Sequence, residues 1–372
     1  MIEEEILSPG FTAVAETYPL RLHPPLVQRH RMASTYRPAL GLREAANVAM
    51  LLGSPLLLTG DPGVGKTQAA YWLAAELGLD EPLRFDVKSN TTGTDLLYRF
   101  DDVRRFRDAT LGGQQPLVTY LRLNALGEAL VRAAGGRAIL RSLDGQMLVD
   151  DNLGRHAEML RQAFGEESLA SAPYPTMSML LSGDERFRTA EPEHHLVLID
   201  ELDKAPRDTP NDLLAEVEEL RFAIPELGVS VVVEGAGRPI IIITSNSEKS
   251  LPEPFLRRCA FFDIPYPDSE LELQAIVDGA IDDLSGGEPL VRDAIAFVRQ
   301  LRADEGIRKP PGIAELLAWL NVLVASQGDA RLLTLSDIVY ENRPSALSAL
   351  LKSPADHNAG QTLLTRWSVE HP

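Results

Sequence analysis

Cysteine is nearly absent from this chain of 372 residues, and Cys259 is the only one. A single cysteine excludes an intrachain disulfide and a cysteine-rich metal site, so we interpret it as a small buried side chain. The 7 histidines include the pair His194 and His195, but no further ligand follows them at a spacing typical of metal sites. These two residue types therefore give no indication of a structural metal centre.

Long apolar runs are also missing, since none approaches the roughly 18 residues of a membrane-spanning helix. The N-terminal residues Met-Ile-Glu-Glu-Glu lack the basic start and apolar centre of a secretory signal. We therefore expect a cytoplasmic protein without a membrane span.

Basic residues are scarce relative to acidic ones. The chain has 36 basic and 54 acidic residues, a net charge of −18, and this excess of negative charge disfavours loose binding to the phosphate backbone of nucleic acid.

The pattern of what is present predicts an α/β protein. A hydrophobic fraction of 44% suits a globular chain with a sizeable core, and the length suits two or three domains. From Tyr36 onward, short apolar runs alternate with helical patterns, the rhythm of a parallel sheet flanked by helices. We predict five strands, buried on both faces, at 56–59, 83–87, 196–199, 240–244 and 261–264, and helices at 42–52 and 66–77.

A glycine-rich loop follows the first predicted strand and reads Gly60-Asp-Pro-Gly-Val-Gly65-Lys66-Thr67. Glycines allow backbone amides to curl around a phosphate, the lysine reaches the β- and γ-phosphates, and the threonine hydroxyl ligates Mg²⁺. The loop therefore predicts a nucleotide triphosphate site with Mg²⁺. Its binding residues would be Gly60, Asp61, Pro62, Gly63, Val64, Gly65, Lys66, Thr67 and Gln68.

An acidic pair, Asp200 and Glu201, ends the strand at 196–199. Ligands of open α/β sheets bind at the carboxyl ends of strands, so we expect Asp200 to hold Mg²⁺ together with Thr67. Glu201 would orient and polarise the water that attacks the γ-phosphate. The alternative is that the pair forms only an acidic cluster at a helix N-terminus.

Two further segments carry candidate catalytic groups. Asn246 follows the strand at 240–244 and could hydrogen-bond the attacking water or the γ-phosphate, although Ser-Asn after a strand is also a common turn. Arg257 and Arg258 precede the last strand, where one of them could reach the γ-phosphate bound by a neighbouring subunit. A solvated helix end is the alternative, and the sequence does not decide between the two arginines.

Together these residues resemble the AAA+ ATPases, and within them the MoxR-like group, over about residues 36–352. The glycine-rich loop and the run Val197-Leu-Ile-Asp-Glu-Leu-Asp-Lys-Ala-Pro206 are its most specific parts, and the run resembles a Walker B strand. Thr244-Ser-Asn246 is similar to sensor 1, and Arg257 or Arg258 falls where the arginine finger is expected. The resemblance implies a five-stranded parallel P-loop sheet flanked by helices, followed by a small all-helical lid. It also implies a helix at 209–220, after the Walker B strand.

The resemblance also fixes the expected domains. These are an N-terminal extension (1–35), a nucleotide-binding domain (36–267) with an insertion at about 88–194 and a hairpin at about 221–238, a helical lid (268–352) and a C-terminal tail (353–372). Inside the insertion we predict helices at 120–134 and 156–164 and a hairpin at 139–149. The lid would hold helices at 268–284, 289–304, 312–326 and 334–352.

Some features depart from the family pattern. The usual sensor 2 motif is missing, and Arg308 or Lys309 would have to supply its cation, with Lys309 our candidate nucleotide contact. The sequence from about 134 to 190 exceeds what short family members contain, which puts the pore geometry in doubt. Tyr120 to Gly127 loosely matches the stretch that lines the central pore in related rings, but an amphipathic helix packed in the core is an equal alternative.

We therefore expect Mg²⁺-dependent ATP hydrolysis by a homo-oligomeric ring, a hexamer by resemblance. The work would be remodelling or maturation of a protein partner, for which the resemblance suggests a von Willebrand factor A domain protein. Alternatives are a nucleotide-gated scaffold with incidental hydrolysis, a kinase of small substrates, and the NTPase subunit of a DNA-targeting defence complex. The acidic balance disfavours the last, and no Asn-Lys-x-Asp motif indicates guanine specificity.

Overall fold

The structure is a computed structural model that describes residues 33–113, 115–181, 183–234, 237–246, 251–267, 269–281, 284–327, 334–337 and 347–371. The chain divides into two compact units. The larger comprises residues 38–62 and 66–265, and the smaller comprises residues 266–372 with 63–65 and the described residues up to Arg37.

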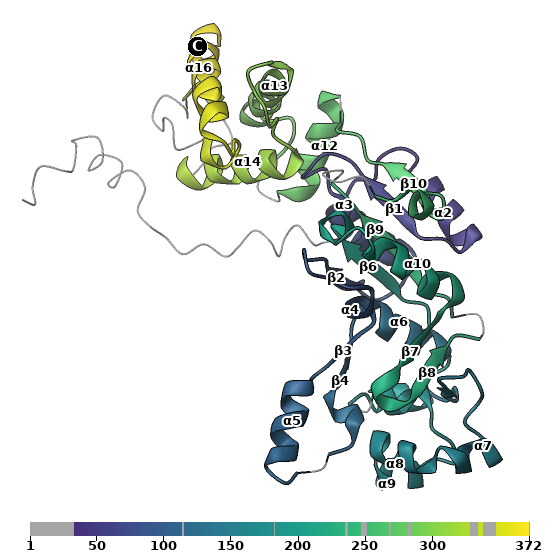
Figure 1. Cartoon of the computed structure of the whole chain (residues 1–372). Helices are drawn as coiled ribbons and strands as arrows, with labels where there is room; N and C mark the ends of the chain where they lie inside the picture. The colour runs from purple at the N-terminus through teal and green to yellow at the C-terminus, as the bar shows by residue number, and fades with distance from the viewer. Residues whose placement is uncertain are drawn as a thin grey trace, which may run out of the picture. The chain divides into compact units, whose positions relative to one another are not determined.

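A sheet of five parallel strands forms the centre of the larger unit (Figure 1). Its strands are β1 (Leu56–Thr59), β2 (Leu83–Asp86), β6 (Leu196–Asp200), β9 (Ile240–Thr244) and β10 (Ala260–Asp263), in the order β10-β1-β9-β6-β2. All four pairings are parallel. The predicted fold class is confirmed, because the continuous apolar runs of β1, β6 and β9 are buried in the interior of the sheet.

The helices beside the sheet agree with the sequence predictions. They are α2 (Leu42–Leu52), α3 (Lys66–Glu76) and α10 (Thr209–Glu219), with the single-turn α11 (Glu253–Leu256) before β10. Helix α2 ends at Gly53, whose φ of 61° lies in the left-handed region that glycine adopts without strain. Helix α3 begins directly after the glycine-rich loop, so its first turn faces the same edge as the carboxyl ends of the strands.

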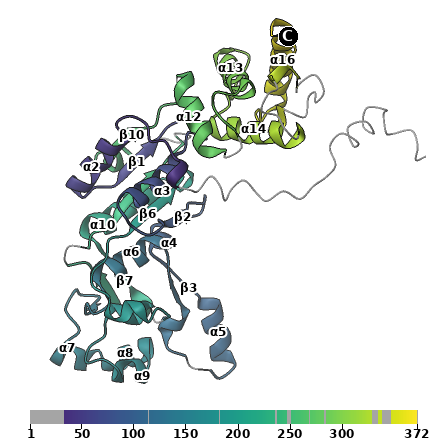
Figure 2. The same cartoon turned by 180° about the vertical axis from the view of Figure 1, so that it is seen from behind.

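Residues 88–194 lie outside the five-stranded sheet. They form α4 (Gly93–Leu97), β3 (Tyr98–Phe100), α5 (Asp102–Thr110), η3 (Leu117–Tyr120), β4 (Leu121–Leu123) and α6 (Ala125–Ala134). Then follow β5 (Arg141–Ser142), α7 (Asp150–Arg155), α8 (Ala157–Phe164), α9 (Glu166–Ala170), η4 (Met177–Leu181) and η5 (Arg186–Thr189). Figures 1 and 2 show β3, β4 and α5 as an arm that projects from the rest of the larger unit.

The helix predicted at 120–134 is wrong over its first residues. Tyr120 ends a 3-10 turn, and Leu121–Leu123 pair antiparallel with β3 as strand β4. The helix α6 begins only at Ala125, after Asn124 has used its side chain to donate a hydrogen bond of 2.6 Å to the Asp95 carbonyl. The sequence Leu-Arg-Leu alternates as a strand requires, and a partner strand 20 or so residues earlier decided against the helix.

Two hairpin regions join in a second sheet of three strands. Strands β7 (Arg221–Ile224) and β8 (Val229–Val232) pair antiparallel around η7 (Pro225–Leu227), and β5 lies beside β8, which gives the order β5-β8-β7. At the turn predicted at Asp144-Gly145, Gly145 has a φ of 80°, and Arg141 and Met147 form an antiparallel bridge. These elements and α6 share one apolar core with β6, which attaches the added sequence firmly to the sheet.

The smaller unit is helical. It contains η2 (Ala33–Thr35), α12 (Glu270–Ala280), α13 (Pro289–Ala303), α14 (Ile313–Gln327) and α16 (Pro354–Glu370). Three helices predicted at 268–284, 289–304 and 312–326 are thus present, while residues 338–346 of the one predicted at 334–352 lie outside the described residues. Phe297 lies at the centre, with its ring 5.7 Å from that of Trp319 and 5.8 Å from that of Trp367.

Residues 353–372, interpreted from the sequence as a tail, contain the helix α16. Ser353 caps the helix by accepting a hydrogen bond from the Asp356 amide, and Pro354 occupies the first helical position. Leu363, Leu364 and Trp367 are buried, so α16 contributes to the core of the smaller unit. None of the helices in the described part of the chain is long and apolar enough to cross a membrane.

The crossing of α4 and α6 yields a stability prediction. A Cβ atom at Gly127 would lie 2.0 Å from the Leu97 carbonyl oxygen, which is backbone and cannot rotate away. We expect Gly127→Ala to lower the free energy of unfolding by about 3 kcal/mol, measured by urea denaturation. The control is Gly154→Ala in α7, where a Cβ meets nothing within 4 Å and alanine favours the helix. Equal stability of the two variants would contradict the packing described.

Candidate functional site

The glycine-rich loop connects β1 to α3 with three residues in left-handed backbone conformations. Gly60, Gly63 and Gly65 have φ values of 132°, 79° and 95°, which side-chain-bearing residues rarely adopt. Val64 between them is buried and anchors the loop. Backbone amides arranged in this way at a helix start form a ready anion site.

Lys66 is buried at the first position of α3. Its Nζ atom donates hydrogen bonds to the carbonyl oxygens of Gly60, at 2.8 Å, and Asp61, at 3.0 Å. Burial lowers the pKa of this amine below its usual value, while the nearby carboxylates of Asp203 and Asp200 act in the opposite direction. The amine is therefore held under the loop, beside a cluster of acidic groups.

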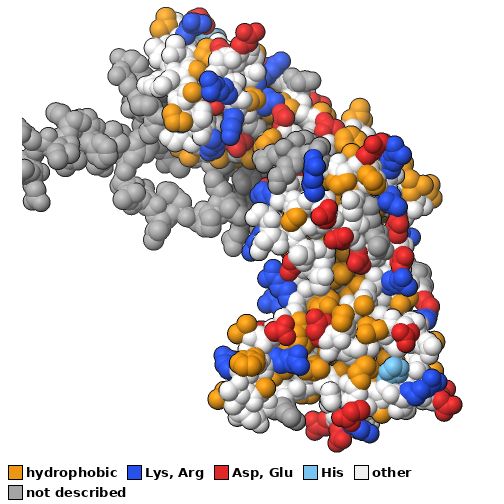
Figure 3. Space-filling model, viewed as in Figure 1, with side chains coloured by type: hydrophobic (Ala, Val, Ile, Leu, Met, Phe, Trp, Pro, Cys, Tyr) orange, Lys and Arg blue, Asp and Glu red, His pale blue; other side chains and the backbone are white. Residues whose placement is uncertain are grey.

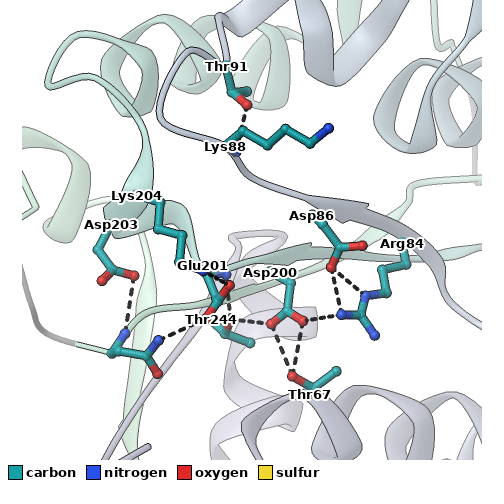
Figure 4. A network of polar contacts seen from close by, with 11 residues as sticks. Thr67, Arg84, Asp86, Lys88, Thr91, Asp200, Glu201, Asp203, Lys204 and Thr244 are labelled. Atoms are coloured by element: carbon teal, nitrogen blue, oxygen red, sulfur yellow. Dashed lines mark hydrogen bonds and ion pairs between the residues drawn. The ribbon is translucent and has the colours of Figure 1, made fainter. Parts of the chain in front are cut away.

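Asp200, at the end of β6, interacts with side chains from several elements (Figure 4). The Thr67 hydroxyl lies 3.1 Å from both carboxylate oxygens, and the Thr244 hydroxyl donates to Oδ1 at 2.6 Å. The Arg84 Nη2 atom on β2 forms an ion pair with Oδ2 at 2.9 Å. The structure thus brings together Thr67 and Asp200, the two residues predicted to hold the metal.

Glu201 has an unusual backbone conformation for a residue with a side chain. Its φ is 61°, in the left-handed region, and its amide donates to the Thr244 hydroxyl at 2.8 Å. The Asn246 side-chain amide donates to Glu201 Oε1 at 3.2 Å, and Lys204 forms an ion pair with Oε2. The predicted partners Glu201 and Asn246 are therefore in contact, and the carboxylate is held at both oxygens.

Asp203 orders the segment that carries Asn246. It is buried in η6 (Leu202–Lys204), and its Oδ1 atom accepts a hydrogen bond from the Asn246 backbone amide at 3.2 Å. The residues that follow β6 and those that follow β9 are thus joined side to side. This contact places the Asn246 side chain next to Glu201.

Arg257 and Arg258 lie at the end of α11, where both have partners other than the cluster around Asp200. Arg257 forms an ion pair with Glu253, one turn earlier, and its side chain is 75% exposed. Arg258 pairs with Glu218 on α10 and is 47% exposed. The two arginines, with Glu253 and Pro254, line a surface hollow of about 360 Å³.

Arg308 and Lys309 belong to the smaller unit, on the connection between α13 and α14. The Arg308 amide donates to Asp356 Oδ1 of α16 at 2.8 Å, so the helix missed from the sequence anchors this connection. Their predicted role toward a nucleotide remains a prediction.

The donors present fit a magnesium nucleotide. A threonine hydroxyl and a carboxylate converge at 3.1 Å beside an amide-lined loop and a buried lysine, and hard oxygen donors with few protein ligands suit Mg²⁺. In the described residues no group of three or more histidine, cysteine, aspartate or glutamate side chains is placed to hold a metal ion by itself. A metal here would therefore take most of its remaining ligands from phosphate and water.

Sequence reasoning gave no role to Arg84 or to the Thr244 hydroxyl, nor to Asp203 and Lys204, which hold Asn246 and Glu201. The alternation Leu83-Arg84-Phe85-Asp86 on an otherwise apolar sheet was the available indication, because it places two charged side chains on one face. The Thr244 hydroxyl gave no such indication, since threonine is common at strand ends. Its bridging position depends on the register of β9 against β6.

The profile of the AAA domain (dynein-related subfamily) matches residues 55–259, which is more than half of the chain. The chain belongs to this family. Membership supports nucleotide-dependent ATPase activity, and AAA ATPases generally use ATP and Mg²⁺ and are usually oligomeric. No curated protein matches the chain.

The Thr244 bridge can be tested by removing its hydroxyl without changing its shape. We expect Thr244→Val to lower the free energy of unfolding by about 2 kcal/mol, because the Glu201 amide and the buried Asp200 carboxylate each lose a partner. Thr244→Ser keeps the hydroxyl and should recover most of the loss in the same denaturation experiment. If Thr244→Val were as stable as Thr244→Ser, the hydroxyl bridge would not contribute to stability.

Proposed function

We propose that this AAA protein is a MoxR-like, Mg²⁺-dependent ATPase that works as a ring, by resemblance a hexamer, and remodels or matures a protein partner. A von Willebrand factor A domain protein is the proposed partner. The observation that carries the ATPase part is the meeting of Thr67, Asp200, Glu201 and Asn246 where β6 and β9 end, next to Lys66. In Figure 3, acidic and basic side chains are interspersed over the visible face, which does not favour a nucleic-acid partner.

Under this proposal each residue of the site has a separate task. Thr67 and Asp200 hold Mg²⁺, which would neutralise charge on the β- and γ-phosphates. The loop amides bind the phosphate oxygens, and Lys66 exchanges the carbonyls of Gly60 and Asp61 for them. The metal and loop sides of the site are therefore supplied by β1, α3 and β6.

Glu201 accepts a hydrogen bond from the attacking water and orients it toward the γ-phosphate. Asn246 fixes one oxygen of this carboxylate and Lys204 binds the other, so the direction of the carboxylate is set by two partners. Positioning of this kind is the main contribution that a protein can make to phosphoryl transfer. The helical smaller unit is, in this proposal, the lid whose movement couples hydrolysis to work.

A neighbouring subunit would complete the site with an arginine, and we propose Arg257 for this role. Its side chain is more exposed than that of Arg258, and its partner Glu253 is exposed as well, so the ion pair is weakly held. Arg258 is instead joined to α10 through Glu218. The proposal therefore assigns Arg257 to the neighbouring subunit and Arg258 to a surface ion pair within its own subunit.

A nucleotide-gated scaffold is the second candidate, favoured by one observation. Both oxygens of Glu201 already have partners, one of them the cation of Lys204, which would make it a slow base. In that case ATP binding would order an assembly while hydrolysis would be incidental.

The substitution Glu201→Gln tests the proposed role of Glu201 in ATP hydrolysis. We expect Glu201→Gln to bind ATP with an affinity within about threefold of the wild type and to hydrolyse it at least about 100-fold more slowly, because the water loses its base. Phosphate release and equilibrium binding measure the two effects. Glu158→Gln, an exposed carboxylate on α8, is the matched control and should behave as the wild type.

Two outcomes would contradict the proposal. Undiminished hydrolysis by Glu201→Gln would remove Glu201 from the mechanism. Wild-type turnover as slow as that of the variant, together with assembly driven by ATP, would favour the scaffold.

Mixed rings test the arginine. We expect Arg257→Ala to bind ATP but to lose turnover by about 1,000-fold, the effect typical of a missing finger, while Arg258→Ala stays within about tenfold of the wild type. An equimolar mixture of Arg257→Ala and Glu201→Gln should regain part of the activity. Some interfaces then combine an intact Glu201 with an intact Arg257 from the neighbour.

The mixture separates a finger from a structural residue. Loss of turnover in Arg258→Ala alone would reverse the assignment. Failure of the mixture to gain activity, with both variants assembling normally, would show that Arg257 does not act across an interface.

A further inference from the structure

We propose that Arg84 sets the Mg²⁺ requirement of the site, because its guanidinium and the metal ion share the carboxylate of Asp200. The inference rests on the proposed function, in which Asp200 and Thr67 hold Mg²⁺. The inference adds a positioning residue on β2, a strand that carries neither the glycine-rich loop nor the acidic pair.

The register of the sheet brings Arg84 to Asp200. Strand β2 runs parallel to β6, with Asp86 opposite Asp200 and Arg84 opposite Leu198. Side chains two residues apart lie on the same face of a strand, so Arg84 and Asp86 share the face of Asp200. Figure 4 shows the Arg84 guanidinium between the two carboxylates.

The contacts are those of a shared cation. Arg84 Nη2 lies 2.9 Å from Asp200 Oδ2 and 2.6 Å from Asp86 Oδ1, and Arg84 Nε donates to the same Asp86 oxygen at 2.8 Å. Burial lowers the pKa of the guanidinium, but its hydrogen bonds to Asp86 and the charge of Asp200 outweigh this effect and raise the pKa above its usual value. Arg84 is therefore a permanent positive charge.

The Asp200 oxygen that pairs with Arg84 also lies next to Thr67, the other residue proposed to hold Mg²⁺. Asp200 Oδ2, which pairs with Arg84, is also 3.1 Å from the Thr67 hydroxyl. A Mg²⁺ ion next to Thr67 would thus meet a carboxylate whose charge is already partly compensated. Because Asp200 is only 5% exposed and the Arg84 side chain 27%, water and salt screen this competition weakly.

Asp86 moderates the competition because it draws Arg84 away from Asp200. Its side chain is 65% exposed and lies outside the cluster around Thr67, so it can hold the guanidinium without a role in metal binding. Neutralising Asp86 leaves Arg84 with Asp200 as its carboxylate partner. Removal of Arg84 and neutralisation of Asp86 should therefore shift the Mg²⁺ requirement in opposite directions.

The experiment is a Mg²⁺ titration of the full chain with a fluorescent ATP analogue at fixed concentration, followed by anisotropy. We expect the half-saturating Mg²⁺ concentration to fall about tenfold in Arg84→Met and to rise about threefold in Asp86→Asn, from the removal or strengthening of one nearby positive charge. Arg84→Lys keeps the charge and should stay within about twofold of the wild type. Arg99→Met, an exposed arginine paired with Asp95 in the arm, should leave the titration unchanged.

Thermal unfolding with the analogue provides a second reading that does not depend on the dye signal. The Mg²⁺ concentration that raises the melting temperature should shift in the same direction in each variant. An unchanged or higher Mg²⁺ requirement in Arg84→Met would overturn the inference, and so would a lower one in Asp86→Asn. If the wild type bound no nucleotide at any Mg²⁺ concentration, the proposed function itself would fail, and this inference with it.

Discussion

The carboxylate of Asp200 is the group on which the arrangement of the site depends. A charge that is 95% removed from solvent is costly unless hydrogen bonds and ion pairs compensate it. Here the compensation comes from three different elements: Thr67 of α3, Thr244 of β9 and Arg84 of β2. Asp200 thereby connects the end of the glycine-rich loop with the centre and the edge of the sheet. A movement of any of these elements away from Asp200 would deprive its buried carboxylate of a partner.

The position of the Glu201 carboxylate depends on that of Asp200. Glu201 follows Asp200 directly, and the chain must turn sharply there, with a left-handed φ that would cost about 1–3 kcal/mol if it were unsupported. The support is a short relay, in which the Glu201 amide donates to the Thr244 hydroxyl and that hydroxyl donates to Asp200. Because both hydrogen bonds use the Thr244 hydroxyl, one side chain positions the residue proposed for the metal and the backbone of the residue proposed for water.

The sequence was sufficient for the sheet and for the meeting of Asp200 with Thr67, because apolar runs and a parallel sheet bring strand ends to one edge. It failed where a distant partner decides. Leu121–Leu123 form a strand only because β3 is beside them, and the aromatic contact of Trp367 gives α16 its place. Arg84 was missed for the same reason, since its partner lies more than 100 residues away and is defined by register alone.

Three cations have internal partners of modest strength: Lys66 and Arg257, which are proposed to meet phosphate, and Arg84, which is proposed to compete with Mg²⁺. Lys66 is bound to two backbone carbonyls, and Arg257 to an exposed carboxylate, while Arg84 is divided between two acidic groups. A ligand gains only the difference between its own contacts and those it replaces. A single phosphate offers little advantage over these partners, whereas a magnesium triphosphate replaces several of them at once. Selectivity for a triphosphate over smaller anions then follows from the internal pairing of the cations as much as from the shape of the loop.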